Sequence, residues 1–351
     1  MKNKMVNKSF LTLLTIYLLI MVLFGFQEKD NFKLAYSMGK IIGINEPKTK
    51  AAENYIFYNI GSVDCDKNGN IYVLDRLGYC VKVFDKYGKF VKKLFKKGKG
   101  PNEISSPQEI KINKFNNNIY ILQDYGFTIK EFDRNGNFIK IFNLPEQFFS
   151  PFDFITENKI IYIPTISKTK KKYYLNIVNL KTLKMEKKLI RIAYHPFLND
   201  GQFFVLNKDL IWSVPRNTNN VIAYNYITGK QVERIKIKGK FKKNETTKLL
   251  NGRAIVPFIY NSAIPFFIKD NLYLLLTIRR YKDKTIKSLK NPLSIKNYIY
   301  IKREGVFVKK TYLKNCDFGE IKYILGDKLI FGFRDPYPHL KIVMIKKSFN
   351  K

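Results

Sequence analysis

Short apolar runs separated by turn residues follow one another along most of the chain after Gln27. The runs are rich in β-branched and aromatic residues and are bounded by Gly, Asn or Asp, as in Ile71–Leu74 and Val81–Phe84. This is the pattern of strands and their turns. Almost no segment shows the 3.6-residue apolar period of a helix. The pattern therefore predicts an all-β fold.

The stretch from Asp64 to Phe142 contains one pattern twice. Its landmarks recur 48 positions later, where Ile71, Phe84, Gly88 and Phe90 become Ile119, Phe132, Gly136 and Phe138. A period of this length is typical of propeller blades. One copy is a small antiparallel sheet that cannot bury both faces alone, so copies stacked around an axis would complete the core.

Weaker runs continue to the C-terminus and predict further sheets, giving a six-bladed β-propeller of four-stranded antiparallel blades over residues 30–351. The segment Phe32–Ile44 is left over as strand material, and we expect it to complete the last blade and close the ring. The structural alternative is a seven-bladed ring in which Phe32–Tyr58 forms its own blade.

The first copy reads D-x-x-G-x-I-Y-V-x-D … V-x-V-F-D-x-x-G, and Gly98-Lys99-Gly100-Pro101-Asn102-Glu103 and Pro107 follow it. This signature resembles the NHL-like repeats of bacterial six-bladed β-propellers over roughly residues 60 to 142. Gly and Pro at fixed offsets mark a definite loop shape between blades. The resemblance implies a fold and barely constrains chemistry, because that family contains binding proteins and several enzymes.

Residues 1–29 predict an export signal or a membrane anchor. Lys2, Lys4 and Lys8 precede an apolar run from Phe10 to Phe26, which is long enough for a hydrophobic helix. No small-x-small cleavage site is visible before Gln27, which favours an uncleaved anchor. The lysines place the N-terminus in the cytoplasm and the body outside it. A cleaved signal would instead leave a periplasmic or secreted protein.

The formal net charge is +36. Such a charge attracts polyanions, so polyanion binding is one hypothesis. Lys, Asn, Ile, Phe and Tyr are abundant everywhere, however, and Lys outnumbers Arg, whereas bidentate phosphate recognition favours Arg. We therefore expect a general solvated basic surface and no specific nucleic-acid partner.

Cysteine and histidine are scarce. Cys65 and Cys80 fall in one predicted blade and could be neighbours, but with Cys316 the three are expected to be isolated buried thiols. His195 and His339 are the only histidines, which excludes a zinc site with several imidazoles.

The motif Asp64-x-Asp66-x-Asn68-Gly69 matches much of an EF-hand calcium loop, which requires flanking helices. Here strands flank it, so a hairpin turn is the favoured interpretation and no metal or other cofactor is expected. The resemblance implies a second possibility, because gluconolactonase-like propellers hold a central metal through acidic and amide side chains. The weak candidates for such a site are Asp75, Asp124, Asn220 and Asp335.

Most aromatic residues in the strands should be buried between blades. Two predicted loops, Phe148-Phe149-Ser150-Pro151-Phe152 and Asp335-Pro336-Tyr337-Pro338, combine proline with aromatic rings that a compact loop would not easily bury. Phe148, Phe149, Phe152 and Tyr337 are therefore the candidate binding residues.

No catalytic constellation is evident. The sequence favours a non-enzymatic binding or scaffold propeller in the cell envelope, which recognises a protein, peptide or glycan through loops on one face of the ring. The alternative is a metal-dependent hydrolase or lactonase with carboxylate ligands in the central channel.

Overall fold

The computed structural model describes residues 33–44, 46, 48–144, 146–164, 173–192, 204–214, 220–238, 248–250, 253–255, 259–269, 271–280, 293–303, 305–334 and 337–348. It divides into two units, one of Met1–Ala35 with Lys346–Lys351 and one of Tyr36–Ile345. In the described ranges no helix is long and apolar enough to cross a bilayer. The predicted signal or anchor over residues 1–29 lies outside those ranges.

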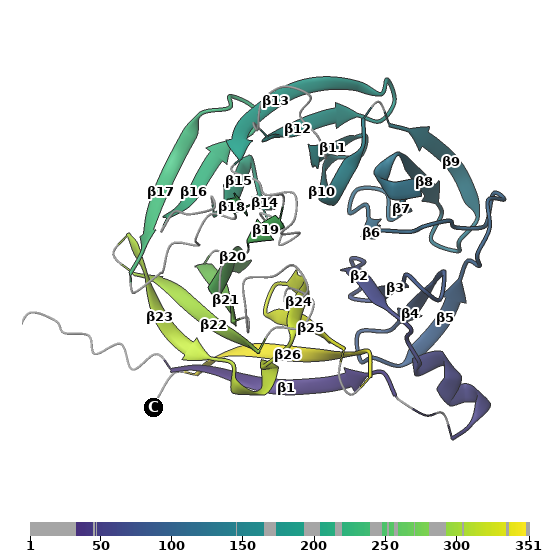
Figure 1. Ribbon diagram of the computed structural model, residues 1–351, viewed down its shortest axis with the longest axis horizontal. Coiled ribbons are helices and arrows are strands. Elements are labelled where there is room, and N and C mark those ends of the chain that lie inside the picture. Colours follow the sequence, from purple (N-terminus) through teal and green to yellow (C-terminus); the bar gives the residue numbers. More distant parts are fainter. Residues whose placement is uncertain are drawn as a thin grey trace, which may run out of the picture. The chain divides into compact units, whose positions relative to one another are not determined.

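Antiparallel sheets follow one another in chain order through the Tyr36–Ile345 unit (Figure 1). The first sheet consists of β2 (Ile60–Cys65), β3 (Ile71–Asp75), β4 (Cys80–Phe84) and β5 (Phe90–Leu94). The second consists of β6 (Glu109–Ile112), β7 (Ile119–Gln123), β8 (Thr128–Phe132) and β9 (Phe138–Asn143). The third consists of β10 (Phe148–Thr156), β11 (Lys159–Pro164), β12 (Tyr173–Asn179) and β13 (Lys184–Ile192).

An eight-stranded sheet comes next and divides into two antiparallel halves. The first half consists of β14 (Phe204–Asn207), β15 (Leu210–Ser213), β16 (Asn220–Asn225) and β17 (Gln231–Ile237). The second consists of β20 (Ile259–Ile268), β21 (Asn271–Arg280), β22 (Ser294–Arg303) and β23 (Val306–Tyr312). The halves join where β17 pairs with β23 in parallel.

The last sheet has the order β1-β26-β25-β24, with bounds β1 (Lys33–Ile42), β24 (Glu320–Leu325), β25 (Lys328–Phe333) and β26 (His339–Ser348). A small separate hairpin has the strands β18 (Lys248–Leu250) and β19 (Arg253–Ile255). Three short 3-10 helices complete the described elements, namely η1 (Lys50–Tyr55), η2 (Asp124–Gly126) and η3 (Lys314–Cys316).

The first strands of several neighbouring four-stranded groups contact one another. β2 contacts both β6 and β24, β6 contacts β10, and β14 contacts β20. The first and last sheets are therefore adjacent, as in a β-propeller, and the predicted all-β propeller fold is confirmed. β1 is the outer strand of the last sheet, as we expected for Phe32–Ile44. β1 and η1 are the elements described within Phe32–Tyr58, and they do not form a four-stranded blade of their own.

The 48-residue repeat has direct structural counterparts. Ser62 Oγ accepts a hydrogen bond from Ile110 N, and Asp64 Oδ2 accepts one from Ile112 N, both at 2.8 Å. Each bond joins positions 48 residues apart, so β2 and β6 run in the same direction. The side chains of one first strand thereby pair with edge N–H groups of the next, which would otherwise be buried without a hydrogen-bond partner.

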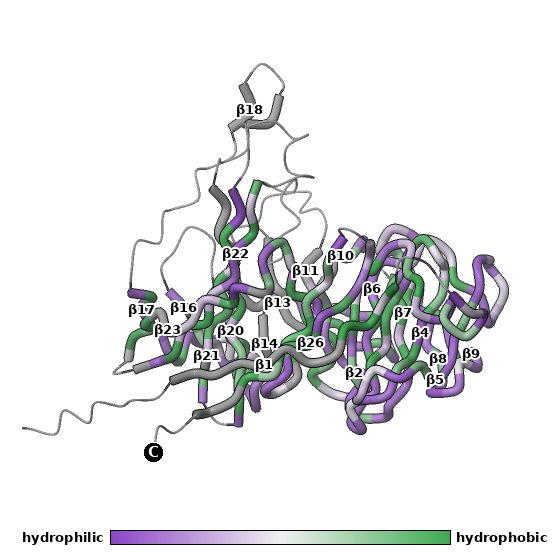
Figure 2. Tube along the Cα trace, turned by 90° about the horizontal axis from the view of Figure 1, so that it is seen from below, coloured by the Kyte–Doolittle hydropathy of each residue, from purple (hydrophilic) through white to green (hydrophobic). Residues whose placement is uncertain are grey.

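The turn residues behave as the sequence predicts. Gly69, Gly88 and Gly136 have φ values of 81°, 79° and 94°. Asp66 Oδ1 accepts hydrogen bonds from the backbone N–H groups of Asn68 and Asn70, both at 2.9 Å. The EF-hand-like motif is thus a hairpin turn held by a carboxylate. Figure 2 shows apolar strand segments alternating with hydrophilic turns along the trace.

Two buried lysines hold the links that lead into the first two sheets. Lys82 Nζ donates to the carbonyl oxygens of Ile56, at 2.5 Å, and Glu53, at 3.3 Å. Lys130, 48 positions later, donates to those of Gly100 and Glu103, both at 2.8 Å. Both side chains are buried, and burial lowers the pKa of each. These two lysines therefore do not belong to the solvated basic surface that the composition predicts.

Candidate functional site

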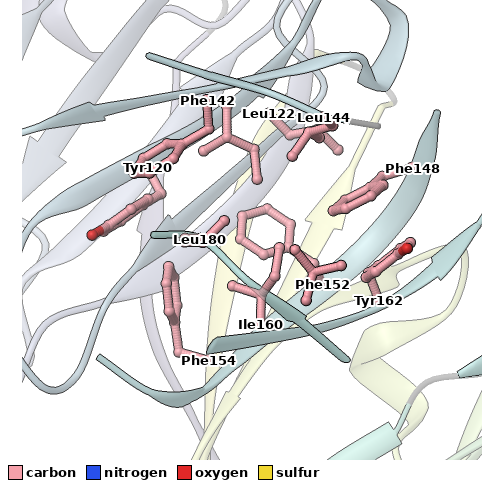
Figure 3. Close-up of a cluster of buried hydrophobic side chains, with 12 residues drawn as sticks. Tyr120, Leu122, Phe142, Leu144, Phe148, Phe152, Phe154, Ile160, Tyr162 and Leu180 are labelled. Carbon is pink, nitrogen blue, oxygen red and sulfur yellow. The ribbon is translucent and has the colours of Figure 1, made fainter. Parts of the chain in front are cut away.

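Two of the three phenylalanines expected in an exposed loop belong to the core. Residues 148–152 form the start of strand β10, and Phe148 and Phe152 are fully buried. They pack into the cluster drawn in Figure 3, where the Phe148 ring stacks on Tyr162 with centroids 3.5 Å apart. Expecting these two rings on the surface is wrong, because a strand with a register shift between Phe149 and Phe152 turns both inward. The Phe149 side chain lies outside the described part.

Tyr337 and His339 lie together at the start of β26. Tyr337 is half-buried, and its ring centroid lies 5.0 Å from that of His339. His339 stacks on Phe333 at 4.9 Å, and its Nδ1 lies 2.8 Å from the Tyr337 carbonyl oxygen. The backbone of Gly43, just after β1, passes so close that an added Cβ would lie 2.7 Å from His339 Cβ. His339 therefore sits where the N-terminal segment meets the last sheet.

A pH-dependent stability follows from His339. Burial and the nearby Lys341 ammonium lower the pKa of the His339 imidazole, although the Tyr337 carbonyl acts in the opposite direction. The unfolded chain then binds this proton more tightly, so the free energy of unfolding falls as pH drops through about 6.5, the unfolded value. We expect His339→Phe to lose less stability than wild type between pH 7 and pH 5 in urea titrations. His195→Gln is the control, and an identical pH profile for His339→Phe would contradict the assignment.

Asp75 and Asp124, two of the weak metal candidates, hold loops through hydrogen bonds. Asp75 accepts from the backbone N–H groups of Tyr58, at 2.9 Å, Asn59, at 2.8 Å, and Gly78, at 3.1 Å. Both of its oxygens are thereby engaged, which explains a carboxylate at the end of a buried strand without a metal.

Asp124 accepts from the hydroxyl groups of Ser105, at 2.6 Å, and Thr128, at 2.7 Å. Asn220 begins β16 in another sheet, and Asp335 lies outside the described residues. Across the described ranges, no group of three or more His, Cys, Asp or Glu side chains is placed to hold a metal ion. The three cysteines are buried and free, as predicted.

A different set of charged groups gathers on the first strands of the sheets. Four charged side chains interact electrostatically here, namely Asp64 on β2, Glu109 and Lys111 on β6, and Asp153 on β10. The Tyr323 hydroxyl of β24 hydrogen-bonds to Asp64. Burial raises the pKa of Asp64. Burial by itself would lower the pKa of Lys111, but the three carboxylates together have the larger effect and raise it. The Lys111 ammonium thus compensates part of the negative charge contributed by β2, β6 and β10.

This cluster is not predicted above, because the candidate acids there lie at strand ends, whereas Asp64 and Lys111 lie within strands. One signal was available. Asp64 and Lys111 interrupt apolar first strands with charges, which is uncommon in a buried strand unless the charges meet.

Exposed apolar side chains gather at one end of the first two sheets. We call this the link end, because each sheet begins there and its second strand turns into its third. Tyr58, Leu77, Tyr125 and Phe127 are exposed there by 69%, 65%, 68% and 49%. These four residues are the apolar rim. Most other aromatic rings of the strands are buried, so these four exposed side chains are candidate contact residues.

Hydrogen bonds join the two halves of the apolar rim. Arg76 N donates to Asn59 O at 2.8 Å, which fixes the turn carrying Leu77 against the segment of Tyr58. Arg76 Nε donates to Pro107 O at 3.1 Å, in the link between the two sheets. Ser105 in the same link bonds to Asp124, which begins the turn carrying Tyr125 and Phe127. Hydrogen bonds therefore connect the segments that carry the apolar rim to one another through the link between the two sheets.

The second half of the apolar rim has an uncommon backbone. Asp124, Tyr125 and Gly126 have φ values of 52°, 57° and 90° in succession. Gly126 cannot be replaced without displacement, since an added Cβ would lie 2.2 Å from the carbonyl oxygen of Phe148. Gln147 Nε2 donates to Tyr125 O at 2.6 Å. Non-glycine residues in this conformation cost free energy and concentrate at functional sites.

Comparisons with known proteins support the fold. Residues 50–194 match the model of a family described as a 6-bladed β-propeller. This agrees with the class of fold that the sequence predicts, while the NHL-like name remains a prediction. No curated protein matches the chain.

Among solved structures, the chain is similar to a protein of Bacteroides fragilis named as an exported protein, with 14% identity and a TM-score of 0.58 over 90% of this chain and 96% of that one. It is equally similar to a member of the DUF4221 family from Bacteroides vulgatus, with 11% identity and a TM-score of 0.58 over 90% and 99% of the two chains. At these identities the likeness concerns the fold alone.

Proposed function

We propose that this chain is a six-bladed β-propeller, closed by β1, that binds a protein, peptide or glycan in the cell envelope without catalysing a reaction. The single observation that supports this function is the apolar rim, whose four exposed side chains stand on segments held by the buried carboxylate of Asp75 and the half-buried one of Asp124. Aromatic side chains on rigid turns bind partners at low cost in conformational entropy.

The proposed location follows from the N-terminal pattern. Lys2, Lys4 and Lys8 before the apolar run Phe10–Phe26 support export, with the propeller outside the cytoplasm and the N-terminal segment as its anchor. The similar protein from Bacteroides fragilis, named as exported, is consistent with this location.

A matched pair of variants tests the binding surface. One carries serine at all four positions of the apolar rim. The control carries serine at four apolar residues with similar exposure elsewhere, which are Tyr87, Val91, Phe115 and Ile227. Both remove surface rings and methyl groups without touching the core, so both should melt at the wild-type temperature.

We expect immobilised wild type and control to retain the same component of a cell-envelope fraction. The rim variant should bind that component at least about 100-fold more weakly, since two or more hot-spot side chains are lost. Equal retention by the rim variant and the control would overturn the proposed surface.

A further inference from the structure

Arg76 stands beside Leu77 in the turn between β3 and β4, and its side chain is fixed in place. Its stem lies where Gly61 has no side chain, because a Cβ added to Gly61 would lie 2.3 Å from Arg76 Cγ and 2.4 Å from Arg76 Cδ. Gly61 is the extra residue of a bulge, since the β2–β3 register shifts between Ile60 and Ser62. Bulges re-aim side chains and are frequent beside functional sites. The bulge therefore gives the Arg76 stem a defined path over β2.

The guanidinium group of Arg76 reaches the link between the first two sheets, where its Nε donates to Pro107 O at 3.1 Å. The residue is exposed, and within the described part of the chain its two terminal nitrogens have no hydrogen bond or ion pair. The neighbouring carboxylate of Asp75 already accepts three backbone N–H groups. Arginine keeps its charge and presents several N–H donors in a planar fork. Arg76 is therefore a permanent cation, fixed beside the apolar rim, with donors available to a partner.

A second cation borders the same turn. Lys97 is exposed in the link after β5, and its Nζ lies 4.9 Å from the ring centroid of Tyr79, the last residue of the turn. The carboxylate of Glu103 in this link pairs with Lys96 at 3.4 Å, and the described residues place no carboxylate within ion-pair distance of Lys97. Two exposed cations therefore accompany the half of the apolar rim that contains Leu77.

We propose that the link end binds a peptide segment in which an aspartate or glutamate side chain is flanked by apolar residues. This inference rests on the proposed function and deepens it, because it names the class of partner that the apolar rim contacts. The guanidinium fork of Arg76 matches the two oxygens of a carboxylate. Because its stem and Nε are fixed before binding, little side-chain entropy is lost when the carboxylate arrives.

The apolar rim accounts for the residues on either side of the acid. Leu77 offers methyl groups and no ring face, which favours apolar side chains over a sugar as the bound groups. The aromatic rings of Tyr58, Tyr125 and Phe127 are of the kind that anchors peptide side chains. A net charge of +36 adds a long-range attraction for an acidic partner.

Selection of a random peptide library, displayed on phage, against the immobilised full-length chain tests this inference. Wild type should enrich sequences in which an acidic residue is flanked by large apolar residues, whereas Arg76→Gln should enrich the apolar residues without the acidic one. The most enriched peptide, synthesised with both ends capped, should bind Arg76→Gln about tenfold or more weakly in titration calorimetry, the usual effect of one hydrogen bond to a charged group. The caps exclude a terminal carboxylate as the bound group.

Two further variants separate the position of the guanidinium from its charge. Gly61→Ala keeps the charge but displaces the Arg76 stem, so it should weaken binding of the same peptide by a smaller factor. It also keeps the inference testable if loss of the bond to Pro107 destabilises Arg76→Gln. Arg134→Gln is the matched control, because Arg134 is exposed on the turn between β8 and β9, at the opposite end of the second sheet. It should bind like wild type.

The outcomes distinguish this inference from the proposed function. Enrichment of apolar peptides without an acidic residue, or equal binding by Arg76→Gln and Arg134→Gln, would overturn the inference. If wild type enriched no peptide but still retained an envelope component through the apolar rim, a glycan for example, the inference would fail and the proposed function would stand. If the acidic peptide bound the serine variant of the apolar rim as tightly as wild type, the proposed surface would fail and only the contact with Arg76 would stand.

Discussion

A chain that begins at residue 43 should lose stability sharply compared with one that begins at residue 30. The shorter chain lacks β1, which covers β26 in the last sheet. It also lacks Ile42, a fully buried side chain that packs with Phe57, Ile330 and Leu340. Loss of such a side chain costs about 2–5 kcal/mol, and the strand's backbone hydrogen bonds add to this.

Thermal unfolding followed by circular dichroism checks this prediction. The chain from residue 43 should melt well below the longer chain and over a broader range, because the first and last sheets would separate before the others. The chain from residue 30 is the control for removal of the N-terminal segment alone. Equal melting temperatures and equal transition widths would show that β1 does not hold the sheets together.

The second large effect is expected from Lys130→Met. Methionine fills the same space but leaves the carbonyl oxygens of Gly100 and Glu103 without the donor that binds them. Hydrogen bonds to charged groups contribute about 1.5–3 kcal/mol each, so we expect a loss of about 2–4 kcal/mol. Lys82→Met should have a comparable effect, because it repeats the arrangement one sheet earlier.

Urea unfolding of both variants provides the measurement. Lys140→Met, at an exposed position of β9, is the control for loss of one positive charge and should stay within about 0.5 kcal/mol of wild type. If Lys130→Met unfolded at the same urea concentration as the control, the buried ammonium would not hold the link in solution.

The sequence predicts the closing strand but not the burial of the two lysines. The closing strand was predicted from the unassigned Phe32–Ile44 segment, because a ring of antiparallel sheets needs its last sheet completed. The buried lysines were not predicted, although Lys82 and Lys130 stand 48 positions apart in the repeat. Composition alone predicts that every lysine is exposed to solvent. The carbonyl groups that bind these two lysines belong to links far away in the sequence, so no local pattern predicts the contact.

The positions of the candidate site residues were also not predicted from the sequence. The sequence predicts a loop for Phe148-Phe149-Ser150-Pro151-Phe152 because of its proline, whereas this run begins strand β10, in which Phe148 and Phe152 are buried. The apolar rim was not predicted, because single exposed residues such as Leu77 carry no local signal. Only the hydrogen bonds between turns and links show that Tyr58, Leu77, Tyr125 and Phe127 share one end of the molecule.

The sequence by itself determined the all-β class, the 48-residue period, the glycine turns and the strand left over for closure. Those features are local, because strand alternation and the positive φ of residues such as Gly69 and Gly136 are properties of a few neighbouring residues. The tertiary structure alone decided which charges are buried and which rings are exposed. These outcomes depend on contacts between sheets, and a residue's own sequence neighbourhood does not specify what packs against it.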